Sequence, residues 1–255
     1  MDQKERAELL QKLHVKGSPV IFFNIWDAGG AKALEEAGAK AIATGSWSVA
    51  AANGFSDGQD LPIELALANA KRITAAVDLP VTIDFEGGYA EDIPQLKENI
   101  AAVIAAGAVG INFEDQIVGG EGLYSIERQS SRIRAVREAA DEAGIAFFIN
   151  ARTDIFLKIL PAPDTEELVE QAAARARAYA DAGASGFFAP GMRDPALIGK
   201  MCELSPLPVN IMVMGDTPSS KKMAELGVAR ISYGPGPYRQ AMEFLKEGAK
   251  KALEY

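Results

Sequence analysis

Short, continuously apolar runs alternate along the chain with longer segments of helical periodicity, and the alternation occurs eight times. The runs lack the polar residue at every second position that marks a half-exposed strand, so they predict strands covered on both faces. They span residues 20–27, 39–46, 80–87, 109–115, 146–154, 184–190, 208–215 and 229–234.

The segments between these runs predict helices, and four of them end at an Ala-Gly turn, with glycine at positions 38, 107, 144 and 183. Glycine readily adopts the left-handed conformation that ends a helix before the next strand. Eight strand–helix units without a linker or low-complexity segment predict an α/β fold, a (β/α)₈ TIM barrel that forms one domain over residues 1–255. An open doubly wound sheet is the alternative. No G-x-G-x-x-G follows the first run, so dinucleotide binding has little support.

The amino-acid composition limits the classes of partner that the protein could bind. The 26 Lys and Arg residues against 35 Asp and Glu residues give a net charge of −9 without any basic run, which argues against nucleic acids and anionic membranes. No stretch approaches the roughly 18 apolar residues of a membrane span, and the charged N-terminal segment lacks a secretory apolar core. Cys202 is the single cysteine and fits a reducing compartment. We therefore expect a cytoplasmic protein.

Polar side chains gather where the predicted strands end. In a barrel of this kind, catalytic groups come from the C-terminal strand ends and the loops after them, so we expect these side chains on one rim. For any one residue, the simpler interpretation is a strand end that meets water, but carboxylates and an arginine on adjacent strands favour a site. The residues are Asp27, Ser46, Asp84 with Glu86, Glu114 with Asp115, and Arg152 with Asp154, while Asn210 lies earlier in the seventh run.

Carboxylates that lie so close together raise one another's pKa unless a cation neutralises them. Oxygen ligands are those that Mg²⁺ or Mn²⁺ prefers, and His14, the only histidine, could not build a zinc site. Arg152 would hold a substrate carboxylate in bidentate geometry, and metal and arginine together would stabilise an enolate formed from a 2-oxo acid. The alternative is that Arg152 only pairs with Asp154 or Glu114.

Four motifs, found in order, carry a resemblance to a known family. They are TGSWSVAAANGFSD (44–57), IDFEGGYAED (83–92), GINFEDQ (110–116) and INARTDIF (149–156). The chain resembles the isocitrate lyase/phosphoenolpyruvate mutase superfamily over roughly residues 20 to 215. The resemblance implies a (β/α)₈ barrel, a Mg²⁺ ion and a pyruvate-like enolate. It also implies a tetramer in which the last helix is often exchanged between neighbours, and we expect a homo-oligomer, a dimer or a tetramer.

The same resemblance implies roles for individual residues. It gives Asp84 as the direct metal ligand and Glu86 and Glu114 as residues that hold the ion through water. It implies catalytic roles for Arg152, on the substrate carboxylate, and Asp57, near the metal. The residues implied to bind substrate are Ser46, Trp47, Gln116 and Asn210.

The loop after the fourth strand departs from the family pattern. Residues 114–129, EDQIVGGEGLYSIERQ, contain no cysteine, histidine or lysine, so the K-[KR]-C-G-H loop of the carbon–carbon lyases is absent. Gln116 stands where the mutases and phosphonopyruvate hydrolases place a lysine, and no asparagine occurs in residues 116–140. The glycine-rich loop could close as a lid, with Tyr124 as an acid or, more simply, a packing residue.

The remaining metal–arginine core suits a Mg²⁺-dependent lyase of a small 2-oxo or 2-hydroxy carboxylate. Decarboxylation of oxaloacetate is the simplest such reaction, and retro-aldol cleavage of a substituted malate comes second. The alternatives are phosphoenolpyruvate mutase or phosphonopyruvate hydrolase chemistry at a P–C bond, and a non-catalytic binding barrel. A phosphate-binding isomerase or synthase that uses the loops after the last two strands is a further alternative.

Overall fold

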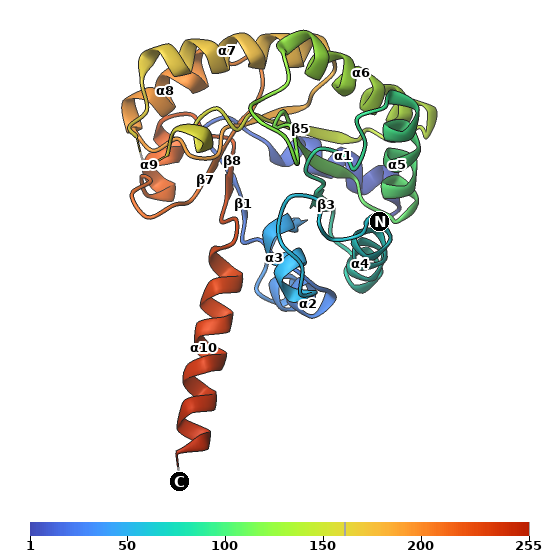
Figure 1. Cartoon of the computed structure of the whole chain (residues 1–255), viewed down its shortest axis with the longest axis vertical. Helices are drawn as coiled ribbons and strands as arrows, with labels where there is room; N and C mark the ends of the chain where they lie inside the picture. The colour runs from blue at the N-terminus through green and yellow to red at the C-terminus, as the bar shows by residue number, and fades with distance from the viewer. Residues whose placement is uncertain (161, 255) are drawn as a thin grey trace.

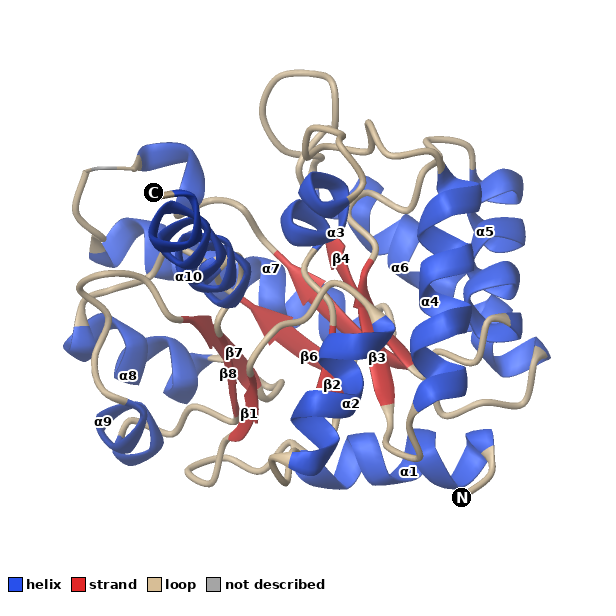
Figure 2. Cartoon of the chain, turned by 90° about the horizontal axis from the view of Figure 1, so that it is seen from below, coloured by secondary structure: helices blue, strands red, loops and turns tan. Residues whose placement is uncertain are grey.

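Eight parallel strands lie side by side in the order β1-β8-β7-β6-β5-β4-β3-β2 and are surrounded by helices (Figure 2). The computed structural model describes residues 1–160 and 162–254. A parallel bridge between Ile25 and Thr44, just after β1 and β2, brings the two edges of the sheet together. The strands are β1 (Val20–Phe22), β2 (Ile42–Ala43), β3 (Val81–Asp84), β4 (Gly110–Glu114), β5 (Phe148–Arg152), β6 (Gly186–Phe188), β7 (Val209–Met212) and β8 (Arg230–Ser232). The predicted (β/α)₈ barrel is confirmed, with strands shorter than the apolar runs.

The helices follow the strands on the outside of the barrel (Figure 1). Side-chain oxygens cap several of their N-termini, and the cap of α2 is Asp27, whose Oδ1 accepts a hydrogen bond of 2.7 Å from the Gly30 amide. They are α1 (Gln3–Leu13), α2 (Ala28–Glu36), α3 (Ser46–Ala52), α4 (Ile63–Ala76), α5 (Ile93–Ala105), α6 (Ile126–Glu142), the 3₁₀ turn η1 (Leu157–Ile159), α7 (Glu166–Asp181), α8 (Pro195–Leu204), α9 (Ser220–Glu225) and α10 (Gly236–Leu253). None of the helices in the described residues is long and apolar enough to span a membrane.

The last helix, α10, leaves the barrel and extends away from it (Figure 1). Among its apolar side chains, Phe244, Leu245 and Leu253 are exposed, and Phe244 is 84% exposed. Burying such side chains is favourable, so this helix carries apolar surface that the chain itself does not cover.

The first helix, α1, covers the N-terminal end of the barrel. Its Gln3 side chain donates hydrogen bonds to the carbonyls of Ile104 and Ala108, just before β4. His14, which follows the helix, is buried and stacks on Phe148 of β5 at 3.9 Å between ring centres. His14 is therefore a packing residue at the end of the barrel opposite the predicted site.

Burial, together with the positive charge of Arg230, lowers the pKa of His14 to about 3. Between about pH 6.5, its ordinary value, and pH 3, the unfolded chain takes up a proton that the folded chain does not. The stabilising contribution of neutral His14 to the free energy of unfolding is therefore complete above pH 6.5. It decreases on acidification by about 1.4 kcal/mol per pH unit.

The variant His14→Phe lacks the titrating imidazole and therefore lacks its pH-dependent contribution to stability. We expect its free energy of unfolding, measured in urea, to fall less steeply than that of the wild type between pH 6 and pH 4.5, by about one proton per molecule. Parallel curves for the two proteins in this range would show that His14 titrates normally in the folded chain.

Candidate active site

A cavity of about 320 Å³ opens at the C-terminal end of the barrel. It receives side chains from the ends of several strands, as the fold predicts. Its lining comprises Asn24, Gly45, Ser46, Trp47, Asp57, Asp84, Asn112, Arg152, Leu157, Phe188, Pro190, Met212, Ser232, Gly234, Pro235 and Arg239.

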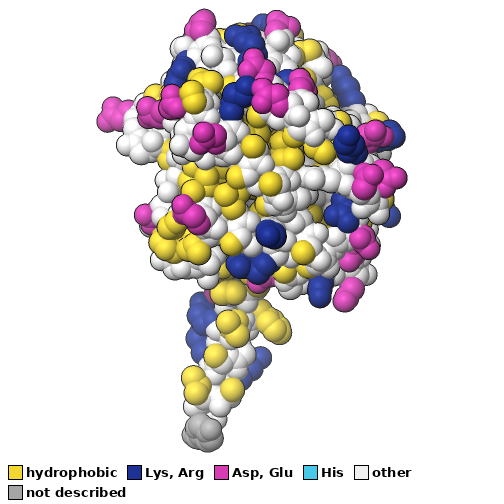
Figure 3. All heavy atoms as spheres, turned by 90° about the vertical axis from the view of Figure 1, so that its right-hand side faces the viewer, with side chains coloured by type: hydrophobic (Ala, Val, Ile, Leu, Met, Phe, Trp, Pro, Cys, Tyr) yellow, Lys and Arg dark blue, Asp and Glu magenta, His cyan; other side chains and the backbone are white. Residues whose placement is uncertain are grey.

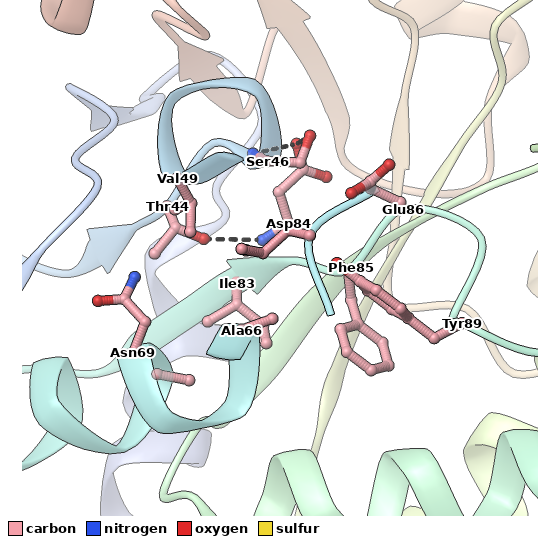
Figure 4. A pocket seen from close by; sticks show the side chains of 12 residues that line it. Thr44, Ser46, Val49, Ala66, Asn69, Ile83, Asp84, Phe85, Glu86 and Tyr89 are labelled. Atoms are coloured by element: carbon pink, nitrogen blue, oxygen red, sulfur yellow. Dashed lines mark hydrogen bonds between the residues drawn. The ribbon is translucent and has the colours of Figure 1, made fainter. Parts of the chain in front are cut away.

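Asp84 is the last residue of β3 and points toward Ser46 (Figure 4). Its Oδ2 accepts hydrogen bonds from the Ser46 amide at 3.2 Å and the Ser46 hydroxyl at 3.0 Å. Its Oδ1 is buried and has no hydrogen-bond partner among the described residues. A buried carboxylate oxygen without a donor is costly, so this atom requires a cation or a bound donor.

Glu86 lies on the turn that follows β3 in a left-handed backbone conformation, with φ at 48°. Its carboxylate accepts a hydrogen bond of 2.7 Å from the amide of Gln59, which is itself left-handed at φ 61°. Such conformations cost non-glycine residues about 1–3 kcal/mol each and concentrate at functional sites. Gly88, two residues further along the same turn, also has a positive φ, of 80°. A Cβ atom at this position would lie only 2.5 Å from Leu96.

Acidic side chains repel one another around this point. Burial raises the pKa of Glu86 to about 8, and the nearby Asp57 and Asp84 carboxylates raise it as well. Burial and then the Asp84 charge also raise the pKa of Asp57, which lies at the open edge of the cavity. A cation between these carboxylates would remove the repulsion.

Arg152 ends β5 and is surrounded by carboxylates. Its Nη1 lies 3.0 Å from Glu114 and 3.9 Å from Asp84, while Nε and Nη2 donate to Asp154 at 2.6 and 2.9 Å. Burial lowers the pKa of Arg152, but Glu114, Asp154 and Asp84 outweigh this effect and raise the pKa above its ordinary value. The ion pairs of Arg152 with Glu114 and with Asp154 therefore both form. They use three of the five N–H groups of the guanidinium, and the other two can donate to a ligand.

Asp115 does not face the cavity. Its Oδ1 accepts from the Asp154 amide at 3.0 Å, and its Oδ2 accepts from Arg175 at 3.0 Å and from the Tyr179 hydroxyl at 2.9 Å. This buried network fixes the chain just after Arg152. Asp27 also follows a strand end but does not line the cavity, because it caps α2.

The residues present fit a hard divalent cation with one direct protein ligand. Within the described part of the chain, no three Asp, Glu, His or Cys side chains stand close enough to form a ready metal cluster. Mg²⁺ usually keeps several waters and uses only one or two carboxylates. Asp84 Oδ1, buried and unpaired, suits the direct position, and Glu86 and Glu114 suit contact through water.

The structure brings five of the sequence-predicted residues together in the cavity: Ser46, Trp47, Asp57, Asp84 and Arg152. Ser46 and Trp47 begin the short helix α3.

Four others lie elsewhere. Glu86 lines an adjoining space of about 20 Å³, and Glu114 is buried against Arg152. Asn210 is 1% exposed and lies behind Ser232, whose hydroxyl donates to its Oδ1 at 3.1 Å. Gln116 lines a neighbouring cavity with Gln59 and Tyr124. Neither Gln116 nor Asn210 is among the residues that line the main cavity.

Four polar residues of the lining were not predicted from the sequence. Asn24 follows β1, and its Oδ1 accepts hydrogen bonds of 2.9 Å from the amides of Tyr233 and Gly234. Asn112 is an inward-facing residue of β4, and Ser232 is the last residue of β8. Arg239 lies in the first turns of α10, with its guanidinium over the Trp47 ring at 4.7 Å. In the sequence, Arg239 could have been found from its position at the end of the segment YGPGPYR (233–239), which follows the eighth strand.

Comparisons with known proteins agree with the fold. The sequence profile of the phosphoenolpyruvate phosphomutase family matches residues 10–253. An uncharacterised protein of Mycobacterium tuberculosis is 33% identical over 227 residues, which is 89% of this chain and 81% of that protein. The 2-methylisocitrate lyase of Salmonella typhimurium is 27% identical over 213 residues, which is 80% of this chain and 69% of the lyase.

Solved structures extend the likeness. A Burkholderia cenocepacia protein provisionally named a phosphonomutase has a TM-score of 0.95 and 48% identity, covering 98% of this chain and 99% of the other. A phosphonopyruvate hydrolase in complex with oxalate and Mg²⁺ shares the fold at a TM-score of 0.83 and 22% identity, covering 97% of this chain and 85% of the other.

Proposed function

The chain belongs to the phosphoenolpyruvate mutase/isocitrate lyase superfamily, and from this premise we propose that it is a Mg²⁺-dependent lyase of a small 2-oxo or 2-hydroxy dicarboxylate. The observation that carries the proposal is the unpaired Oδ1 of Asp84 in one cavity with the Arg152 guanidinium. The named relatives include a lyase and a hydrolase that holds Mg²⁺, which supports this class of chemistry.

Each side chain of the cavity has a role in the proposed reaction. Asp84 would hold the ion directly, and Glu86 and Glu114 would hold it through water. The bound ion supplies positive charge that stabilises developing negative charge on a substrate oxygen. Arg152 donates to the carboxylate beside the oxo group, and the Trp47 amide, at the start of α3, donates to the same end of the substrate, while the Ser46 amide and hydroxyl hold Asp84.

In the simplest case, oxaloacetate loses CO₂. The bond between C3 and C4 breaks, its electron pair enters the enolate of pyruvate, and water returns a proton to C3. Arg152 orients the scissile bond by holding the C1 carboxylate, while Leu157, Phe188 and Pro190 form an apolar wall of the cavity. No acid from the loop over residues 116–127 is required for CO₂ to leave.

A second arginine favours substrates with two carboxylates. Arg239 enters the cavity from α10, and it lines the same space as Arg152. Its guanidinium rests on Trp47, an arrangement that preserves the charge while fixing the plane of the group. We assign to Arg239 the carboxylate distant from the oxo group.

P–C bond chemistry is the second candidate, because the provisionally named phosphonomutase is 48% identical to this chain. The two functions release different products. Purified protein with Mg²⁺ would be supplied with oxaloacetate, substituted malates and phosphonopyruvate, with pyruvate, inorganic phosphate and phosphoenolpyruvate measured separately.

We expect pyruvate from oxaloacetate or a malate, no phosphate from phosphonopyruvate, loss of turnover on addition of a chelator, and recovery on addition of Mg²⁺. Release of phosphate from phosphonopyruvate, or its conversion to phosphoenolpyruvate, would establish the P–C function instead. Absence of turnover on the whole panel with Mg²⁺ present, despite measurable ligand binding, would identify a binding protein.

We further propose that the chain forms a homo-oligomer through α10. In Figure 3 this helix projects from the body with hydrophobic side chains on its surface. The exposed Phe244, Leu245 and Leu253 would be buried against a second copy of the chain. The single cysteine, Cys202, is buried, which is in keeping with the cytoplasmic location that we also propose.

Replacing Phe244 and Leu245 together by glutamate is expected to convert the oligomer to a monomer in light scattering, because two charges would be buried in the contact. The control Lys251→Glu changes the charge of the same helix without removing apolar surface, and it should remain oligomeric. A wild-type chain that is monomeric at all concentrations, or a double variant of unchanged mass, would exclude this interface.

A further inference from the structure

Arg230 is a buried cation inside the barrel that the proposed mechanism does not use. It is the first residue of β8, it is 1% exposed, and its guanidinium lies over the Phe22 ring at 4.2 Å. Asp84 is the nearby opposite charge that raises its pKa, and Arg230 forms no ion pair with it. Burial lowers the pKa of Arg230 to about 9, so the group remains charged at neutral pH.

A buried charge without a paired partner lowers the stability of a fold, and apolar replacements of similar volume are often neutral or stabilising. Packing alone therefore does not explain an arginine at this position. Its Nη1 also has no hydrogen-bond partner among the described residues. Because the buried charge lowers stability, we infer that it acts on ligands in the cavity above it.

Only one layer of side chains separates Arg230 from the cavity. Its Nη2 donates to Asn112 Oδ1 at 3.2 Å, and its Nε donates to the Ser232 hydroxyl oxygen at 3.4 Å. Both Asn112 and Ser232 line the cavity. The positive charge therefore lies directly under the cavity floor, in surroundings of low dielectric constant.

These contacts also decide which way the Asn112 amide faces. Its Oδ1 accepts from Asn150 Nδ2 at 2.8 Å as well as from Arg230, so the oxygen is held down toward the barrel interior. The Nδ2 group is left as the part of the amide that faces the cavity, where it can donate to a ligand. Without Arg230, the amide could turn and present its oxygen to an anion.

We propose that Arg230 is a specificity-determining positioning residue, which fixes Asn112 as a hydrogen-bond donor and makes the cavity floor electropositive, so that doubly charged carboxylates are favoured over singly charged ones. The inference rests on the proposed function for its ligand class, a small dicarboxylate. It adds a buried source of selectivity to the two arginines that line the cavity.

The test compares malonate with its monomethyl ester, because the two ligands differ by a single charge. Binding of each is measured by calorimetry with Mg²⁺ at constant ionic strength, in the wild type and in Arg230→Met. The wild type is expected to prefer malonate. In the variant, the affinity for malonate should fall about tenfold or more, the size expected for hydrogen bonding to a charged group, and that for the ester less than threefold.

Thermal stability distinguishes the proposed role of Arg230 in selectivity from a purely structural role. Arg230→Met should have a melting temperature equal to or above that of the wild type, since an unpaired buried charge has been replaced by an apolar side chain. Arg230→Lys, which keeps a charge but loses the planar donor set, should recover part of the preference for malonate. The control Arg137→Met removes a half-buried arginine that donates to carbonyls before β5 and β6, and it should leave the preference unchanged.

An equal loss of affinity for both ligands, or no loss for malonate, would overturn the inference. So would a wild type that does not prefer malonate to the ester. Because these are binding measurements, they stand whether or not any oxo acid is turned over, and failure of the lyase proposal in the substrate panel remains a separate result.

Discussion

Asp84→Ala is expected to abolish detectable turnover, with a loss of about 10³-fold or more in kcat/KM, and to leave the barrel folded. The carboxylate lies in the cavity with one oxygen bound to Ser46 and the other unpaired, so its removal takes away the proposed direct ligand of the ion. The measurement is Mg²⁺ affinity by calorimetry together with turnover of whichever panel substrate is active.

Asp84→Asn sharpens this prediction. The amide oxygen can still accept the hydrogen bonds from Ser46, so only the charge is lost, and metal affinity should fall in this variant as well. Asp27→Ala is the matched control, because Asp27 also follows a strand but caps α2, and it should keep full metal affinity. Unchanged Mg²⁺ affinity in Asp84→Ala would refute the assignment.

Arg152→Lys is expected to lower kcat/KM by about 10²-fold, mainly through a higher KM. Lysine keeps the positive charge beside Glu114 and Asp154 and so avoids leaving buried carboxylates unpaired, which alanine would do. It cannot reproduce the fork of donors that would hold a carboxylate.

Steady-state kinetics with a dicarboxylate substrate measures the split between KM and kcat. Arg137 lies on α6, donates to carbonyls that precede β5 and β6, and does not line the cavity, so Arg137→Lys is the control and should behave as the wild type. If Arg152→Lys retains both KM and kcat, Arg152 has only the structural role that its ion pairs would give it.

The sequence is sufficient for the barrel because each strand is covered on both faces and therefore leaves a continuous apolar run. It also places Asp84 and Arg152 at the correct rim, since the last residue of a parallel strand in a barrel has little freedom. Asp27 follows an apolar run in the same way, yet the chain turns at once into α2 and uses its carboxylate as a cap. The pattern of residues does not distinguish these two outcomes.

Residues that depend on the path of a loop or on an inward-facing position are harder to predict. The chain after β4 turns back on itself through a bridge between Gln116 and Leu123, which carries Gln116 away from the main cavity. Arg230 stands in the eighth run, ARISYG, and its contact with Asn112 of β4 appears only when the strands close into the barrel. The position of Gln116 therefore depends on a local turn, and that of Arg230 on long-range packing, which local sequence does not encode.

The central claim is that one divalent cation is held at Asp84, facing Arg152. Anomalous diffraction from crystals soaked in Mn²⁺ measures this directly. The account predicts a single strong peak about 2.1–2.2 Å from an Asp84 oxygen, inside the cavity that Arg152 and Ser46 line, with waters between the ion and Glu86 and Glu114. A peak on another face of the molecule, or an empty site at Asp84 under saturating Mn²⁺, would contradict it.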